Sequence, residues 1–315
     1  MLQCRRKSTN KLYQSYINKW ESFCDRRNVN FLSASVVDGL NFLQELYDNP
    51  VYRGYSALAT ARSALSSVLV VDYNNSLIRF GEHPFVKQWM KGVENIRPSS
   101  CRYTEIWDPD VVLNMFKNDS WSPASALSNV VLAKKLVMLL LLCTDNRGQL
   151  IVSLSLDKMI VREDQFIFKL EKSDLKQGRR GYKPELVKIR AFVDCDLCPV
   201  VHLKEYLSRT EHVRGDQKKV FLISRKPFTP VSRDTVSRWV SDVFCSAGIN
   251  TEIFGPGSTR AAAGSKASRK GVPMDSILAK GGWSQTSTFA RFYNKEVKAA
   301  EQDHDVFSKT VLSLE

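Results

Sequence analysis

Long apolar runs are missing from this sequence. A transmembrane helix requires about 20 consecutive apolar residues, and the longest apolar run of the 315-residue chain, at positions 136–143, is much shorter. The basic residues near the N-terminus are not followed by the apolar segment of a secretory signal. The sequence therefore predicts an intracellular protein without a membrane partner.

Histidine is scarce, and cysteine is not arranged in a disulfide framework. The chain has four histidines and seven cysteines, an odd number at irregular spacing, which is typical of a reducing compartment. One cluster could supply four zinc ligands, namely Cys195, Cys198, His202 and His212. Because this spacing matches no zinc finger, we favour no metal here, with a strand that ends at Cys195 and a helix that begins at Pro199.

Acidic residues are outnumbered by basic ones. The chain has 33 Asp and Glu against 46 Lys and Arg, which leaves a net charge of +13 and a pI near 9.4. Such a charge suits a polyanion, because each phosphate that is neutralised releases counterions. Nucleic acid is the expected partner. The hydrophobic content of 43% and the length predict a packed core and two domains.

The first part of the chain shows helical periodicity. Apolar residues recur at helical spacing in three segments, and a fourth begins with a proline suited to a helix N-terminus. The predicted helices span 8–27 with Ser8 as N-cap, 34–47, 56–71, and a segment from Pro84 that presents Phe85, Trp89 and Val93. Periodicity breaks at 95–100, where Pro98 is followed by two serines. We therefore predict a helical N-terminal DNA-clamp domain over residues 1–98.

The rest of the chain, 104–315, predicts a second domain. A strongly apolar segment predicts a buried helix that stops shortly before Arg147, and two β-rich runs around a polar turn predict a hairpin. The expected elements are helices at 130–143, 199–209 and 233–247, the last between a Ser232 cap and Gly248, and strands at 160–161, 166–168 and 186–192. The predicted fold class is mainly α, with a small three-stranded antiparallel sheet in the C-terminal helical domain.

Three short motifs organise the stretch 257–295. They are Gly257-Ser258-Thr259-Arg260 before a small-residue helix that Ser258 caps, Gly281-Gly282-Trp283 at a turn, and Phe292-Tyr293-Asn294-Lys295 at a helix end. In type and order they resemble the tyrosine recombinase (phage integrase) superfamily, most closely the members encoded by eukaryotic mobile elements of the DIRS and Crypton kind. That family reads His-Ser-Thr-Arg, Gly-Gly-Trp and Phe-Tyr-Asn-Lys, so Gly257 stands where the family has a histidine. The 23 positions from Arg260 to Trp283 also match the family.

Cutting a phosphodiester without a metal requires a nucleophile, positive donors on the non-bridging oxygens and an acid for the leaving 5′ oxygen. Arginine suits the donor role because its planar guanidinium group binds phosphate oxygens bidentately, and Arg147 and Arg260 come from separate elements. Lysine is a mobile proton donor, and Lys176 follows the predicted hairpin. Tyrosine acts as a nucleophile when nearby cations help it to ionise, and Tyr293 is our candidate.

The resemblance assigns the same roles to these four side chains and adds Trp283 as a phosphate contact. It implies transesterification to a 3′-phosphotyrosyl intermediate with a free 5′ hydroxyl, followed by strand exchange, with no metal and no other cofactor. It also implies an N-terminal core-binding (SAM-like) domain, double-stranded DNA as partner, a monomer that forms a homo-tetramer at synapsis, and a nuclear location. A catalytic acid or base contributes on the order of 10²- to 10⁴-fold in rate, so Gly257 predicts an impaired enzyme.

Two other functions fit the same pattern. A domesticated protein that binds DNA without cutting it would explain Gly257, and a type IB topoisomerase uses similar chemistry without pairing two sites. The candidate side chains also have ordinary structural roles: a helix C-cap for Arg147, core packing for Trp283, a solvated charge for Lys176, and packing beside Phe289 for Tyr293. Order and spacing together favour the catalytic interpretation.

Further basic residues are candidates for contact with the DNA backbone. We expect both domains to close around duplex DNA as a clamp whose affinity falls steeply with salt. The candidates are Arg62, Lys87, Lys91, Arg179, Arg180, Lys183, Arg233 and Arg238.

Overall fold

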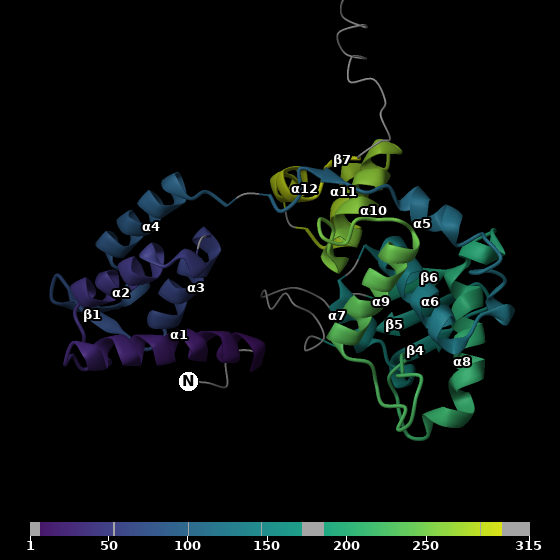
Figure 1. Ribbon diagram of the computed structural model, residues 1–315, viewed down its shortest axis with the longest axis horizontal. Coiled ribbons are helices and arrows are strands. Elements are labelled where there is room, and N and C mark those ends of the chain that lie inside the picture. Colours follow the sequence, from purple (N-terminus) through teal and green to yellow (C-terminus); the bar gives the residue numbers. More distant parts are fainter. Residues whose placement is uncertain are drawn as a thin grey trace, which may run out of the picture. The chain divides into compact units, whose positions relative to one another are not determined.

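The structure, a computed structural model, describes residues 7–52, 54–99, 101–145, 147–171, 186–283 and 285–297 (Figure 1). Contacts between Cα atoms divide the chain into two compact units, Met1–Ser100 and Cys101–Glu315. Among the helices described, none is long and apolar enough to cross a membrane.

The first unit is built from helices and one β-hairpin. Its elements are α1 (Lys7–Arg26), α2 (Val36–Asp48), α3 (Tyr55–Leu65), β1 (Val70–Tyr73), β2 (Ser76–Arg79) and α4 (Pro84–Ile96). Aromatic side chains join α1 to α2, because the ring centroid of Trp20 lies 5.5 Å from that of Phe23 and 5.3 Å from that of Phe42. All three rings are buried, and each burial contributes about 1.5–3 kcal/mol.

The predicted helix 56–71 is wrong in its second half. Helix α3 ends at Leu65, and the chain continues into β1, which pairs in antiparallel with β2. The valines of β1 are β-branched and favour a strand. Asn74 and Asn75 form the turn with φ values of 52° and 59°, the left-handed conformation that a tight hairpin requires and asparagine tolerates.

The ends and faces of two other helices also differ from the prediction. Ser8 lies inside α1 and is therefore not its N-cap. Pro84 opens α4 as expected, but the buried face of α4 carries Val86 and Met90, whereas Phe85 is 60% exposed. Of the three predicted positions, Val93 is buried and Trp89 is half-buried, so the prediction is wrong for Phe85 alone.

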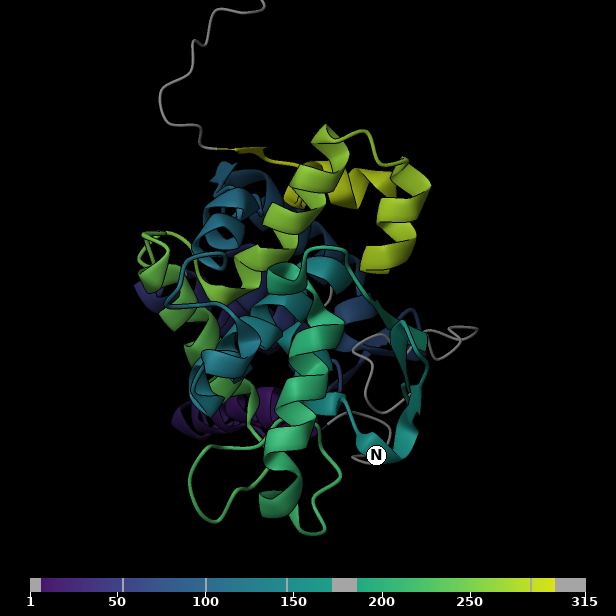
Figure 2. The same ribbon diagram turned by 90° about the vertical axis from the view of Figure 1, so that its right-hand side faces the viewer.

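The second unit is a helical bundle with a small antiparallel sheet at one side (Figures 1 and 2). Its helices are α5 (Pro109–Met115), α6 (Asn129–Thr144), α7 (Gly148–Ser153), α8 (Pro199–Arg214), α9 (Arg233–Ser246), α10 (Thr259–Arg269), α11 (Met274–Gly281) and α12 (Thr286–Phe292). Its strands are β3 (Glu105–Ile106), β4 (Met159–Val161), β5 (Gln165–Lys169), β6 (Leu186–Arg190) and β7 (Glu296–Val297), of which β4, β5 and β6 form the sheet in that order. The predicted fold class, mainly α with this three-stranded sheet, is confirmed.

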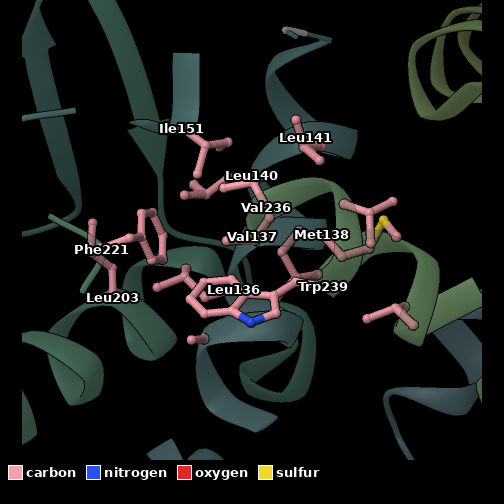
Figure 3. Packing of buried hydrophobic residues seen from close by; sticks show 14 of the residues in the cluster. Leu136, Val137, Met138, Leu140, Leu141, Ile151, Leu203, Phe221, Val236 and Trp239 are labelled. Atoms are coloured by element: carbon pink, nitrogen blue, oxygen red, sulfur yellow. The ribbon is translucent and has the colours of Figure 1, made fainter. Parts of the chain in front are cut away.

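Helix α6 forms the centre of the second unit. It is apolar on nearly all sides, as the sequence predicts, and its side chains pack against Trp239 and Val236 of α9, Leu203 of α8, and Phe221 (Figure 3). The Ser128 side chain accepts a hydrogen bond from the Val131 amide and so caps α6. Because α6 is anchored on every side, the residues at its C-terminal end are held rigidly.

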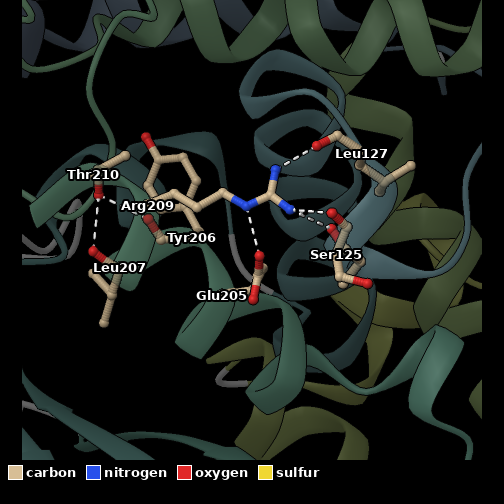
Figure 4. A network of polar contacts seen from close by, with 8 residues as sticks. Ser125, Leu127, Glu205, Tyr206, Leu207, Arg209 and Thr210 are labelled. Atoms are coloured by element: carbon tan, nitrogen blue, oxygen red, sulfur yellow. Dashed lines mark hydrogen bonds and ion pairs between the residues drawn. The ribbon is translucent and has the colours of Figure 1, made fainter.

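Arg209 on α8 fixes the segment that precedes α6 (Figure 4). Its guanidinium group donates hydrogen bonds to the carbonyl oxygens of Leu127, of Ala124 at 3.2 Å and of Ser125 at 2.5 Å. It also forms a 2.6 Å ion pair with Glu205, one turn earlier on the same helix. A single side chain thus provides hydrogen bonds to three backbone carbonyl groups of the irregular segment before α6.

The interpretation of the segment 195–212 is partly wrong. Strand β6 ends at Arg190, so Cys195 does not end a strand but lies in the 3₁₀ turn Cys195–Leu197. Helix α8 begins at Pro199 as predicted and continues to Arg214. His202 is fully buried, with its Nδ1 atom 2.8 Å from the Cys198 carbonyl oxygen, whereas Cys195 and His212 are exposed. Within the described parts of the chain, no three His, Cys, Asp or Glu side chains are placed to hold a metal ion, so the four candidate zinc ligands do not form one cluster.

A short parallel pair of strands joins the two ends of the second unit. Glu105 of β3 pairs with Glu296 of β7, and Ile106 pairs with Val297. The sequence analysis predicted neither strand. The pairing fastens the segment that follows Tyr293 to the start of the same unit.

Candidate active site

Arg260 is the buried centre of the site. It is the second residue of α10 and only 4% exposed. Gly264 in the same helix allows close packing, because a Cβ atom there would lie 3.0 Å from the Phe289 ring. Ser258 is the N-cap residue of α10 as predicted, but its side chain makes no capping hydrogen bond to the helix. The 3₁₀ turn Pro256–Ser258 leads directly into α10, and the Ser258 hydroxyl accepts a 2.9 Å hydrogen bond from Trp107 Nε1.

The Gly-Gly-Trp turn folds over Arg260. Gly282 ends α11 in the left-handed conformation, with φ of 63°, and the chain reverses so that the Trp283 ring centroid lies 4.1 Å from Arg260 Cζ. Arg260 Nη2 donates a hydrogen bond to the Gly281 carbonyl oxygen. Only glycine fits at position 281, since a Cβ atom there would lie 2.1 Å from the Trp283 ring. A cation–π contact and a carbonyl acceptor therefore orient the guanidinium group.

Tyr293 completes the cluster. It directly follows α12, and its ring centroid lies 4.7 Å from that of Trp283 and 5.3 Å from Arg260 Cζ. The Ser265 hydroxyl donates to the Tyr293 carbonyl oxygen at 2.7 Å and accepts from the Lys295 amide at 3.0 Å. Helix α10 thus positions both the arginine and the backbone of the tyrosine. Helices α10, α11 and α12 lie together in both views (Figures 1 and 2).

The end of α6 brings a second arginine and an unpredicted carboxylate. Arg147 is exposed and is the N-cap residue of α7, so it does not cap the C-terminus of α6. That position belongs to Asp145, which is 7% exposed. Burial raises the pKa of Asp145 to about 7, while the positive charges of Arg260, Arg147 and Lys280 oppose this rise.

Sequence reasoning missed Asp145 because the segment 144–148 was interpreted only as a helix end. Two signals in the sequence point to it. An acidic residue is unfavourable at the negative end of a helix dipole, and here it follows a helix that is apolar throughout. Such a carboxylate requires cations nearby, and Arg147 stands two positions later.

Gly257 is exposed, and a Cβ atom added there would have no other atom of the described residues within 4 Å. Its backbone is outside the left-handed region that glycine favours. The site therefore has room for a side chain at the position where the sequence pattern lacks one.

The remaining predicted residues fall into three groups. Lys176, Arg179, Arg180 and Lys183 lie outside the described residues, so their roles stay predictions. Lys87, Lys91, Arg233 and Arg238 are exposed and accessible to a ligand. Arg62 is half-buried and donates a 3.4 Å hydrogen bond to the Gly81 carbonyl oxygen, which indicates a structural role within the first unit.

Comparison by sequence finds no match among protein-family models and none among curated proteins. Comparison by structure finds similar solved proteins. A λ integrase dimer bound to a COC′ core site aligns with a TM-score of 0.52 and 14% identity, over 95% of this chain and 92% of the other. The XerH site-specific recombinase bound to difH aligns with a TM-score of 0.53 and 15% identity, over 93% and 75%.

The chain has the fold of the tyrosine recombinases. A λ integrase tetramer bound to a Holliday junction gives the same result, with a TM-score of 0.51 and 14% identity over 95% of this chain and 75% of the other. The predicted resemblance to the tyrosine recombinases is thereby confirmed at the level of the fold, although identities of 14–15% fall far below what sequence comparison detects. The closer affinity to DIRS and Crypton elements stays a prediction.

Proposed function

We propose that this chain is a tyrosine recombinase that breaks and rejoins DNA through Tyr293. The observation that carries the proposal is the convergence of Arg260, Trp283 and Tyr293 from three separate segments, with Arg260 Cζ 4.1 Å and 5.3 Å from the two rings. This arrangement places a guanidinium group that can bind a phosphate next to a side chain that can act as the nucleophile. The tyrosine recombinase fold adds to this support.

In the proposed first step, the Tyr293 hydroxyl loses its proton to solvent and its oxygen attacks the scissile phosphorus, while Arg147 and Arg260 bind the non-bridging oxygens. The bond to the 5′ oxygen breaks, and this oxygen takes a proton from Lys176 to leave as a hydroxyl. Trp283 Nε1 is buried and has no hydrogen-bond partner among the described residues, which leaves it available to donate to a phosphate oxygen.

The second step reverses the first. The 5′ hydroxyl of another strand gives its proton to Lys176 and attacks the 3′-phosphotyrosyl linkage. The bond to the Tyr293 oxygen breaks, and this oxygen takes a proton from solvent. The number of phosphodiester bonds is unchanged, so the cycle needs no nucleotide hydrolysis. The neighbours in the structural comparison were solved on DNA as a dimer and as a tetramer; we propose that this chain likewise binds duplex DNA and pairs two sites as a homo-tetramer, from a monomer in solution. We place this activity in the nucleus.

Covalent capture tests the proposal. The protein is incubated with a library of nicked duplexes of randomised sequence, denatured, and assayed for DNA that stays attached. We expect adducts with the wild-type chain and none with Tyr293→Phe, which removes only the hydroxyl. Tyr73→Phe is the matched control, since Tyr73 is exposed at 38% in the first unit, and it should form adducts at the wild-type rate. Adducts that persist in Tyr293→Phe would reassign the nucleophile.

One observation favours a second candidate, a protein that binds DNA without cutting it. Gly257 offers no side chain for acid–base catalysis. In that case the chain would bind duplex DNA with a steep salt dependence but yield no adduct with any sequence of the library.

A further inference from the structure

Asp145 occupies a backbone conformation that is costly for its residue type. It ends α6 with φ of 52° and ψ of 29°, the left-handed region in which glycine has the lowest free energy. Residues held in such conformations are concentrated at functional sites. This conformation is therefore a reason to look for a functional role of the carboxylate.

The Asp145 side chain is buried, and the described part of the chain offers its carboxylate no hydrogen-bond donor. It is 7% exposed, and neither carboxylate oxygen has a partner among the residues that the structure describes. Its Oδ2 atom lies against Gly281, because a Cβ atom built on that glycine would approach it to 2.6 Å. Gly281 is also the residue whose carbonyl oxygen accepts from Arg260. Asp145 and Arg260 therefore contact the same residue of the turn.

Among the described residues, three cations from three elements act on this carboxylate through their charge. They are Arg260 of α10, Arg147 at the start of α7 and Lys280 of α11, and their positive charges act against the rise in the pKa of Asp145 that burial causes. A buried carboxylate without donors depends on such charges to ionise at all. Two of the three cations are the arginines that the proposed function assigns to the scissile phosphate.

We propose that Asp145 is a positioning residue for Arg147 and Arg260: its carboxylate serves as their counter-ion before DNA binds, and it takes up a proton when a DNA phosphate replaces it. The proposal rests on the proposed function for the identity of the phosphate.

The proton uptake follows from the charges. Carboxylate and phosphate have the same sign, and in a buried site of low dielectric their repulsion is strong. A phosphate on the two arginines therefore raises the pKa of Asp145 above its value of about 7 in the free protein. Above that pH, binding must add a proton to Asp145, and affinity falls by up to about tenfold per pH unit because one proton is linked.

The test measures the dissociation constant of the protein for a fluorescently labelled DNA duplex. The duplex has a sequence recovered in the covalent-capture assay, or a random sequence if that assay recovers none. All variants carry Tyr293→Phe to prevent cleavage, and the pH is varied from about 6 to about 9 at constant ionic strength. We expect the parent to lose affinity above neutral pH and Asp145→Asn, which stays uncharged, to bind with a much smaller pH dependence. Asp216→Asn, at an exposed aspartate of the same unit, should keep the parent's slope.

A merely structural role predicts that Asp145→Asn binds more weakly at every pH with the parent's slope, and this result would overturn the proposal. Should that variant fail to fold, calorimetry of the parent near pH 8 in two buffers of different ionisation enthalpy counts protons directly. We expect an uptake approaching one proton, and zero uptake or a release would refute the inference.

The same data separate this inference from the proposed function. Adducts in the capture assay together with pH-independent binding would leave the function intact and remove the role of Asp145. Proton-linked binding without adducts would leave the role of Asp145 intact in a protein that does not cut. Absence of DNA binding at every pH would remove both.

Discussion

Restoring a side chain at Gly257 offers the sharpest test of how the site works. Gly257 lies in the 3₁₀ turn Pro256–Ser258 that continues into α10, three positions before Arg260. Residues three apart in a helix share one face, so an imidazole at 257 projects from the same side as Arg260. The open space around an added Cβ atom and the ordinary backbone conformation allow the substitution without strain.

The expected gain in rate can be bounded. General acid–base catalysis contributes on the order of 10²- to 10⁴-fold when the group is well placed, and an imidazole without evolved supporting contacts should realise part of this. We therefore expect Gly257→His to raise the single-turnover rate of adduct formation by about tenfold or more, equivalent to about 1.4 kcal/mol of transition-state stabilisation. Replacing glycine also reduces the entropy of the unfolded chain, so stability should rise slightly or stay the same.

The assay compares adduct formation by the wild type, Gly257→His and Gly257→Ala near pH 7, where neutral imidazole is populated. The alanine variant controls for the backbone effect and should match the wild type. A substrate with sulfur in place of the bridging 5′ oxygen then assigns the role, because a thiolate leaves without protonation. A gain that vanishes on this substrate indicates proton donation, and a gain that persists indicates contact with the phosphate.

The reasoning is refuted if folded Gly257→His reacts no faster than Gly257→Ala. Position 257 would then not face the scissile phosphate. The assumption that the N-terminal end of α10 lies at the reacting atoms would be wrong.

Four further results are expected. Arg260→Lys should lower the rate of adduct formation on the order of 10²-fold or more, because lysine lacks the planar fork that the Gly281 carbonyl and the Trp283 ring orient; a loss of a few-fold would show that charge alone suffices. Trp107→Phe should cost about 1–3 kcal/mol in urea unfolding, since it removes the 2.9 Å bond to buried Ser258, and an unchanged midpoint would contradict this. DNA affinity should fall linearly on a log–log plot against salt, and a slope near zero would argue against phosphate contacts. Asp145 should lower the free energy of unfolding as pH rises from about 4 to about 7. Folding raises the pKa of Asp145 from 3.8 to about 7, so the folded state binds the proton more tightly than the unfolded state and loses this advantage as the proton dissociates. The contribution amounts to up to roughly 4 kcal/mol and should be absent in Asp145→Asn.

Much of this protein was predictable from local sequence patterns. The continuous apolar run of α6, the polar turn between the apolar strands β4 and β5, and the Ser232 cap of α9 are each contained within a few consecutive residues. Gly282, Trp283 and Tyr293 could likewise be singled out, because the motifs that contain them resemble those of the tyrosine recombinases in type and order. Charge composition predicted a polyanionic partner without any reference to structure.

Tertiary structure alone decided which distant groups meet. Ser258 is the N-cap residue of α10, but its hydroxyl accepts a hydrogen bond from Trp107, 151 positions away, and makes no capping bond to the helix. Strand β3 pairs with β7, although the two lie near opposite ends of the second unit in the sequence. Asp145 becomes a buried carboxylate beside Gly281 only because α6 and the turn after α11 are packed together. Periodicity and capping signals arise from interactions within one element, whereas these contacts depend on which surfaces the folded core brings together, and no short stretch of sequence contains that information.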